Sequence, residues 1–374
     1  MKFNTLYHLI FVVKIKNIMK LGILGNGLTS LSLAKCLVKN GIFVDIFSNQ
    51  KNFDILKSRT VGISKKNIDF FNREILNIEK LLWKIKQIDI YSENLKEEKV
   101  LNFKNEDHIL FGMVKNFELQ KKLFLSLKKN KFCNFKEKNL KENFHLNEYN
   151  LIINCDSESL ITKKFFNKRL KKKYNSSAYI TIIKHKKIKN DIAFQIFSQK
   201  GPLAFLPLSE TETSIVYSVK GSESIDLKKL VKKYNFKYSI LNFEKIASFE
   251  LKSSNLRSYY YKNVLAFGDL LHRLHPLAGQ GFNMTLRDIN VLCELIDFRL
   301  NNGLELDQSI CQDFENKTKH KNYIFSTGID FVYEVFNLES KMKNNILSKS
   351  IKFIGKNKFL NKSFEKIANN GFQI

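Results

Sequence analysis

The spacing of apolar residues near the N-terminus predicts a strand, a turn, a helix and a second strand. Short apolar runs occupy 20–24 and 42–47, and between them apolar residues recur at helical intervals over 28–38. Gly25 ends the first run, and Gly41 ends the helical segment. This order is typical of the βαβ unit that opens an α/β domain.

The remaining apolar pattern divides the chain into a mixed part, a β-rich part and a helical part. Helical spacing predicts helices at 118–127 and 289–300, and the chain from Ile310 onward is expected to be helical and basic. Between 177 and 219 short β-rich runs follow one another, which predicts a separate sheet. The strands predicted within and around that region are 149–154, 178–183, 193–197, 203–206, 213–219 and 264–267.

The chain is strongly basic, but the charge is not gathered into a site. Its 374 residues, enough for two packed domains, carry 63 Lys and Arg against 36 Asp and Glu, a formal charge of +27. Almost all the positive residues are scattered lysines, while Gly and Pro are scarce, a skew typical of an AT-rich genome. We therefore attribute the charge to composition and expect no nucleic-acid partner, with weak attraction to anionic lipid as a by-product.

Cysteine usage and hydropathy favour an intracellular chain without a transmembrane helix. The five cysteines lack CxxC spacing, so we predict neither disulfides nor a zinc site, and we expect Cys36 and Cys293 in helix cores. The apolar stretch 6–13 is too short to span a bilayer. We interpret 1–18 as an extension ahead of a translation start at Met19.

The first strand ends in a glycine turn of the kind that binds phosphate. Gly25 allows a tight turn, Gly27 lets the backbone approach a pyrophosphate, and the following helix presents free N–H groups. Ser30 stands where Gly or Ala is usual, and Ser48 stands where an acidic residue usually binds the ribose. The interpretation as a dinucleotide turn is therefore weighed against an ordinary Gly-containing turn.

The most specific segment lies between residues 264 and 283. A strand leads to Gly268 and Asp269, and a proline turn then leads to a second glycine pair that begins a helix. A carboxylate placed there can accept hydrogen bonds from a polyol, and the helix N-terminus faces an electron-rich site. The segment reads GDLLHRLHPLAGQGFN, with Leu270 and Leu271 directly after the aspartate.

This segment resembles the GD…HP.AGQG.N motif of the class A flavoprotein monooxygenases, the para-hydroxybenzoate hydroxylase type. The resemblance is closest to the ubiquinone-biosynthesis hydroxylases. It implies that Asp269 binds the ribityl chain of FAD, that His275 and Pro276 lie beside the flavin, and that side-chain catalysis is not required. The residues of this segment that it assigns to cofactor binding are Gly268, Asp269, Gly279, Gln280, Gly281 and Asn283.

Three further segments resemble the same family. Arg59 begins a segment like R.TALS, which places it beside the flavin, and Gln120 matches the start of a helix that contacts FAD. Asp156 lies in a segment like GADG, whose Asp-Gly pair is implied to contribute to flavin and nicotinamide binding. Here Ser157 replaces the glycine, and Lys163 replaces the usual basic residue. An ordinary strand-to-turn transition explains the last segment almost as well.

The resemblance also implies the fold class. We expect an α/β protein with a Rossmann-like FAD-binding domain of the GR2 type, an interleaved β-sheet substrate domain and a helical C-terminal part. The segment GPLAFLPL resembles the substrate sheet, so its apolar residues would line a cavity facing the flavin, although core packing explains each of them equally well. These cavity residues are Leu203, Phe205 and Leu206. The expected divisions are 19–80, 105–170 and 255–310 for FAD binding, 81–104 and 171–254 for substrate, and 311–374 for the helical region.

The activity implied by the resemblance is hydroxylation of a polyprenylated phenol in ubiquinone biosynthesis. FAD, NADH or NADPH and O2 would act through a flavin hydroperoxide, without a metal. Other ubiquinone-biosynthesis proteins are expected partners, and the chain would be cytoplasmic with peripheral contact at the inner membrane. The alternatives are another aromatic substrate, a flavoprotein reductase, or a scaffold subunit that binds FAD poorly because of its serine substitutions.

Overall fold

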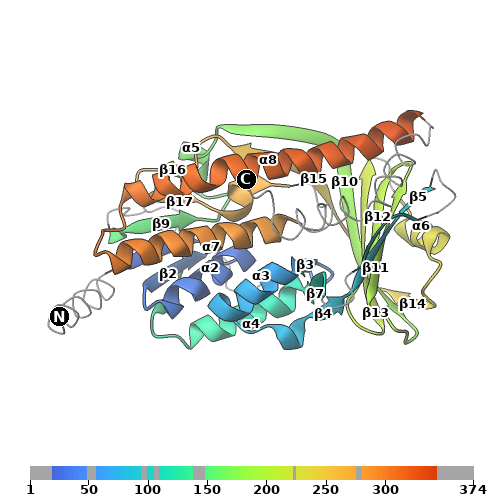
Figure 1. Cartoon of the computed structure of the whole chain (residues 1–374), viewed down its shortest axis with the longest axis horizontal. Helices are drawn as coiled ribbons and strands as arrows, with labels where there is room; N and C mark the ends of the chain where they lie inside the picture. Colours follow the sequence, from blue (N-terminus) through green and yellow to red (C-terminus); the bar gives the residue numbers. More distant parts are fainter. Residues whose placement is uncertain are drawn as a thin grey trace.

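The structure is a computed structural model that describes residues 19–48, 56–93, 99–104, 109–137, 148–221, 225–274 and 280–342. Two sheets lie side by side along the long axis of the molecule (Figure 1). A six-stranded, mostly parallel sheet with helices occupies one half, and a large, mostly antiparallel sheet occupies the other. The fold class expected from the resemblance is confirmed.

The six-stranded sheet has the βαβ arrangement predicted from the N-terminal pattern. Its order is β16-β17-β9-β1-β2-β8, and every pair is parallel except β16 with β17. The central strands are buried on both faces because helices cover the sheet. The strands are β1 (Lys20–Leu24), β2 (Phe43–Ser48), β8 (Cys133–Glu137), β9 (Leu151–Asn154), β16 (Tyr260–Tyr261) and β17 (Val264–Ala266).

Helices and a small sheet surround these strands. Helix α2 packs against both α4 and α7, and α8 runs along the molecule from β16 to the large sheet (Figure 1). A three-stranded antiparallel sheet of order β3-β7-β4 lies between the halves. These elements are α2 (Leu28–Lys39), β3 (Thr60–Ser64), α3 (Lys65–Phe70), η1 (Phe71–Ile75), η2 (Glu79–Leu81), β4 (Trp83–Ile85), β7 (Phe111–Lys115), α4 (Asn116–Lys128), α5 (Leu160–Phe165), η5 (Gly268–Leu270), α7 (Gln280–Asn301) and α8 (Gln308–Met342).

The large sheet has the order β18-β15-β10-β13-β12-β11-β5-β6, with β14 paired to β10. Only β5 with β11 is parallel among its described pairs. Helix α6 (Leu227–Tyr234) covers the face that points away from the six-stranded sheet (Figure 1). The strands are β5 (Gln87–Ser92), β6 (Lys99–Lys104), β10 (Arg169–His185), β11 (Ile192–Ser198), β12 (Gly201–Pro207), β13 (Glu212–Lys220), β14 (Ile240–Phe243), β15 (Ala247–Leu256) and β18 (His272–Arg273).

Most elements with a strong apolar period were predicted correctly, and two were predicted too short. Helix α7 begins at Gln280, nine residues before the predicted start, because polar residues occupy its first buried turns. Strand β10 extends back to Arg169 through a lysine-rich stretch that carries no β pattern. The helix expected from 310 is confirmed as far as Met342, whereas 343–374 and 1–18 lie outside the described residues.

Within the described part of the chain, no helix has the length and apolar character needed to span a membrane.

Candidate functional site

The carboxyl ends of three parallel strands meet at one edge of the six-stranded sheet. The amide of Gly25, after β1, donates to the carbonyl of Phe47 at 2.8 Å. The amide of Cys155, after β9, donates to Leu24 at 3.0 Å, and that of Phe267, after β17, donates to Asn154 at 2.9 Å. Ligands of open α/β sheets bind outside such strand ends. The predicted Gly25 turn and Gly268-Asp269 segment therefore share one edge.

Gly25 occupies a place where a side chain would be strained. Its φ is +101°, and a Cβ built there would lie 3.4 Å from the Ser30 hydroxyl and 3.7 Å from the backbone amide of Asp156. Gly27 differs, because a Cβ at that position would meet no described atom within 4 Å. Gly27 is also the N-cap of α2, so the first turn of a twelve-residue helix faces this open space.

Gly268 brings the second motif onto the same helix. Its φ is +65°, and a Cβ there would lie 2.8 Å from Cγ2 of Thr29, in the first turn of α2. The next residue, Asp269, is exposed. An exposed carboxylate beside a free helix N-terminus can accept hydrogen bonds from a polyol while the helix binds an anion. Thr29 was not singled out from the sequence, because only the close approach of Gly268 reveals its role.

Three other predicted residues lie around the turn. Gln120 is buried on α4. Its side-chain amide donates to the carbonyl of Asn26 at 2.9 Å, so it helps to hold the Gly25 turn in place. Ser48 is the last, half-buried residue of β2. Arg59 is exposed, and its carbonyl accepts from the amide of Asn116 at 3.0 Å, so its position is tied to the start of α4.

The turn after β9 is organised by its own polar residues. The Asp156 carboxylate accepts a hydrogen bond from the amide of Glu158 at 2.9 Å, and the Asn154 side-chain oxygen accepts one from the amide of Asp156 at 3.1 Å. Ser157 is exposed, and Lys163 is an exposed residue 3.9 Å from Glu158. This geometry is that of a well-ordered turn, and it leaves the predicted nicotinamide role of Asp156 a prediction.

The first turns of α7 lie at the same edge but engage different groups. Gln280 is buried, and a Cβ at Gly281 would meet no described atom within 4 Å. Asn283 was assigned to the cofactor by the resemblance, yet its fully buried side chain accepts from the Ser64 amide at 2.9 Å and donates to the Gly62 carbonyl at 2.8 Å. Its contacts hold α7 onto β3. His275, Pro276 and Gly279 lie outside the described residues.

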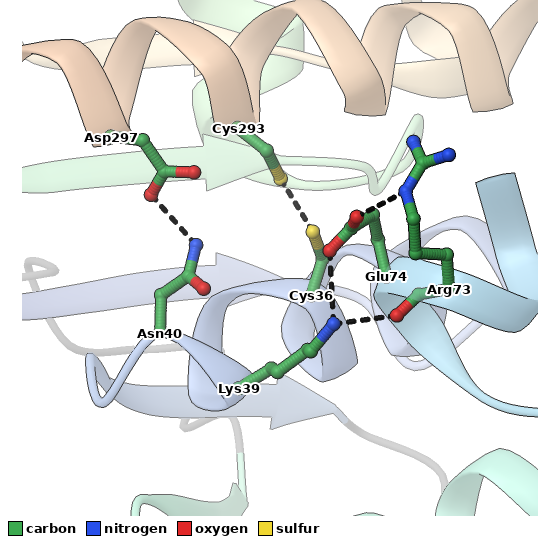
Figure 2. Close-up of polar contacts among 7 residues, drawn as sticks. All are labelled: Cys36, Lys39, Asn40, Arg73, Glu74, Cys293 and Asp297. Carbon is green, nitrogen blue, oxygen red and sulfur yellow. Dashed lines mark hydrogen bonds and ion pairs between the residues drawn. The ribbon is translucent and has the colours of Figure 1, made fainter.

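Helices α2 and α7 are locked together by polar and sulfur contacts (Figure 2). The Sγ atoms of Cys36 and Cys293 lie 2.7 Å apart, and the Asn40 amide donates to Asp297 at 2.7 Å. The hydrogen bond to Cys36, together with burial, raises the pKa of the Cys293 thiol well above its ordinary value. A protonated, buried thiol packs as an apolar group, so the expectation of core cysteines is confirmed.

The large sheet corrects the predicted substrate residues. Leu203 and Phe205 are fully buried in the cluster beneath α6, where Phe205 stacks on Phe194 with ring centroids 4.3 Å apart. That face points away from the six-stranded sheet (Figure 1). The prediction that these two residues line a cavity toward a flavin is therefore wrong. The error arose because the alternate residues of a strand face opposite sides, and the sequence does not tell which side is which.

The opposite face of the sheet carries the residues that sequence reasoning missed. Leu206 packs with Ile85 and Met113 of the small sheet, so it lies on the opposite side from Leu203 and Phe205, and its role in a substrate cavity stays a prediction. By alternation and register, Ala204 and its partner Val216 share this side, and both are partly exposed. Only the pairing of β12 with β13 identifies these residues, and no local pattern in the sequence shows that pairing.

Comparison with curated proteins found relatives that are similar in sequence. No family model matches the chain. It is 23% identical over 232 residues to the mitochondrial ubiquinone biosynthesis monooxygenase COQ6 of Danio rerio, covering 50% of this chain and 48% of that protein. It is 24% identical over 173 residues to the 3-demethoxyubiquinol 3-hydroxylase of Escherichia coli strain K12, covering 44% of each. The chain thus spans about half the length of these curated relatives.

Solved structures match over nearly the whole chain. The p-nitrophenol 4-monooxygenase PnpA of Pseudomonas putida DLL-E4 superimposes with a TM-score of 0.78 at 12% identity, covering 96% of this chain and 99% of that one. The HpxO protein of Klebsiella pneumoniae, in complex with FAD and uric acid, gives a TM-score of 0.74 at 13% identity, covering 95% and 98%. The chain therefore has the fold of the class A FAD-dependent aromatic monooxygenases, and its similarity in sequence is to the ubiquinone-biosynthesis hydroxylases.

Proposed function

We propose that this chain binds FAD and hydroxylates the ring of a phenol, using NADH or NADPH and O2. The observation that carries the proposal is the convergence of the Gly25 turn with the Gly268-Asp269 segment at one sheet edge. The two motifs are 240 residues apart in sequence, yet a Cβ at Gly268 would touch the first turn of α2. This close contact between the two motifs suits a ligand that carries both an anionic group and a polyol.

The described residues fit FAD by their chemistry. The open space at Gly27 and the free N-terminus of α2 would accommodate the pyrophosphate, and the exposed Asp269 would accept from the ribityl hydroxyls. Ser48, at the end of β2, would bind the ribose with a hydroxyl in place of the usual carboxylate. When bound, the flavin supplies the redox chemistry that activates oxygen, and the protein's own residues bind, orient and shield it.

The substrate we propose is a polyprenylated phenol. Ala204, Leu206 and Val216 present partly exposed apolar surface on the side of the large sheet that faces the six-stranded sheet. A surface of that kind would exclude water from the reacting ring and receive an apolar chain. One sequence relative is named a ubiquinone biosynthesis monooxygenase, and another is named a 3-demethoxyubiquinol 3-hydroxylase. Contacts with other proteins of that pathway, and peripheral contact with a membrane, belong to the same proposal.

The decisive experiment is an absorption and fluorescence titration of the purified chain with FAD. We expect flavin bands at near-unit stoichiometry and a large loss of affinity in Asp269→Ala. Glu294→Ala, on the exposed side of α7, is the matched control and should bind FAD normally. A chain that takes up no FAD would contradict the proposal and favour the scaffold alternative.

The substrate is tested separately with the FAD-loaded chain. A short-chain prenylated phenol should stimulate NADH or NADPH oxidation and give a hydroxylated product detected by mass spectrometry. Oxidation that yields hydrogen peroxide alone, with no product from any phenol tried, would leave FAD binding intact and refute the substrate class.

A further inference from the structure

A buried polar cluster joins three elements just behind the proposed cofactor site. The Nε2 atom of His272, on β18, lies 2.5 Å from the Asp288 carboxylate on α7. The other carboxylate oxygen accepts a hydrogen bond from the side-chain amide of Asn322, on α8, at 2.9 Å. The side chains of His272 and Asp288 are only 1% and 2% exposed. The motif carrying His272 was identified from the sequence, but no role in binding was assigned to this residue.

The contact between His272 and Asp288 fixes the orientation of both side chains. A buried carboxylate is costly unless each oxygen has a partner, so Asp288 fixes the positions of both groups that donate to it. The second ring nitrogen of His272, Nδ1, has no hydrogen-bond partner among the described residues. The contact with Asp288 is therefore the polar interaction that sets the orientation of this imidazole.

The imidazole is tied by a short backbone path to Asp269. The amide of Leu271 donates to the carbonyl of Gly268 at 2.9 Å, and the carbonyl of Leu271 accepts from the amide of Leu256 at 2.8 Å. The four residues Asp269 to His272 thus cross from η5 to the edge of the large sheet. This hydrogen-bonded segment joins the backbone of Asp269 to that of His272, whose side chain contacts α7.

We propose that His272 is a positioning residue for FAD, which holds Asp269 in a fixed relation to α7 through its contact with Asp288. The inference rests on the proposed function. His272 acts at a distance and does not touch the cofactor. Its role goes beyond packing because α7 and the Asp269 segment lie at the same sheet edge. The ribityl chain of FAD would contact both, so their relative position affects binding.

The test is the FAD dissociation constant of the full chain, measured by flavin fluorescence. His272→Leu should raise it at least tenfold. His272→Gln should keep it within about threefold of the unsubstituted chain, because a glutamine amide reaches about as far as Nε2 and can still donate to Asp288. Should His272→Leu fail to fold, His272→Asn replaces it, since the shorter amide stays polar but does not reach.

A double-substitution cycle separates positioning from simple destabilisation. If His272 acts through Asp269, the fold-changes of His272→Leu and Asp269→Asn on FAD binding should not multiply in the double variant. Ser326→Ala is the matched control, because it breaks the neighbouring Asn255–Ser326 bond, 2.8 Å long, between β15 and α8. It should lower the melting temperature without changing the FAD dissociation constant.

The outcomes distinguish this inference from the function on which it rests. A normal dissociation constant in a folded His272→Leu chain, or fold-changes that multiply in the double variant, would overturn the positioning role while FAD binding stands. An unsubstituted chain that takes up no FAD would overturn the proposed function, and the positioning role with it.

Discussion

The edge of the six-stranded sheet and the facing side of the large sheet are built in different ways. At the edge, backbone geometry dominates: Gly25 and Gly268 have positive φ, and a side chain added at Gly268 would collide with Thr29. On the large sheet, side chains dominate, because the alternation of Ala204 with its buried neighbours decides which groups face inward. One region offers N–H groups and turns, and the other offers a shaped apolar surface.

This difference predicts that the two regions tolerate sequence change unequally. Every residue except proline supplies a backbone N–H group, so Ser30 and Ser157 can replace the usual small residues without removing these N–H groups. A surface made of side chains changes with each substitution. We infer that cofactor binding is the more robust property of this chain, and that substrate choice depends on the facing side of the large sheet.

The largest effect is expected from a pair of neighbouring substitutions on β12. Phe205→Ala should lower the free energy of unfolding by about 3–5 kcal/mol, because it empties a fully buried ring from the cluster beneath α6. Ala204→Phe, on the other face, should leave FAD affinity intact and raise the KM for a phenol substrate. Urea unfolding and steady-state kinetics measure the two effects.

The outcome can contradict the proposed division of the faces. If Phe205→Ala changed the KM while stability held, or if Ala204→Phe unfolded the chain with no kinetic effect, the two faces would have the opposite roles. The substrate would then contact the face of the large sheet that carries Phe205, and not the face that carries Ala204.

A second prediction concerns the base of the sheet edge. Asn283→Ala should cost about 3 kcal/mol of stability, because it leaves the Ser64 amide, the Gly62 carbonyl and the Asn67 side chain buried without their partner. Asn290→Ala, on the outer side of the same helix, should cost less than about 0.5 kcal/mol. Thermal unfolding of the chain without FAD makes this measurement, and equal losses in both variants would refute it.

The sequence predicted the backbone-built region better than the side-chain-built one, and particular residues show why. Gly25 and Gly268 were found because a glycine ahead of a helix carries its conformational reason locally. Leu203 and Phe205 were placed on the wrong face because the side on which a strand residue lies depends on what covers the sheet, here α6.

Two other features have the same physical origin. The contacts of Asn283 with β3 and α3 join residues about 220 positions apart in sequence, so no local motif predicted them, and its assignment to the cofactor stays a prediction. The strands β3 to β8 were not predicted because they are short, and β3 and β4 pair with β7, a strand well separated from them in sequence. Tertiary contacts of this kind leave no periodic signal.

A third prediction compares two glycines of the sheet edge. Gly268→Ala should destabilise the chain by about 2–3 kcal/mol, because the new methyl group adopts a strained φ and lies 2.8 Å from Thr29. Gly27→Ala should leave stability within about 0.5 kcal/mol, because the methyl group meets no described atom within 4 Å. It should instead weaken FAD binding, since the pyrophosphate would approach there. Unfolding and FAD titration on both variants test this contrast, and loss of FAD affinity without loss of stability in Gly268→Ala would contradict it.

The smallest predicted effect concerns Asp45, a buried carboxylate on β2 of the six-stranded sheet, in contrast to the exposed Asp269. Burial alone would raise the pKa of Asp45, but hydrogen bonds from Lys136, Tyr149 and Lys20 outweigh it and lower the pKa to about 2.

Because the folded pKa lies below the ordinary value of 3.8, the stabilisation is fully present above about pH 4 and is lost as the pH falls toward 2. Asp45→Asn should therefore cost roughly 2 kcal/mol at neutral pH, with the difference from the unsubstituted chain shrinking below pH 4. Urea midpoints across this range measure it. If the difference in stability between the two chains stayed constant with pH, the packing of Asp45 rather than its charge would stabilise the fold. Asp45 and Asp269 would then differ in burial but not in a structural role for charge.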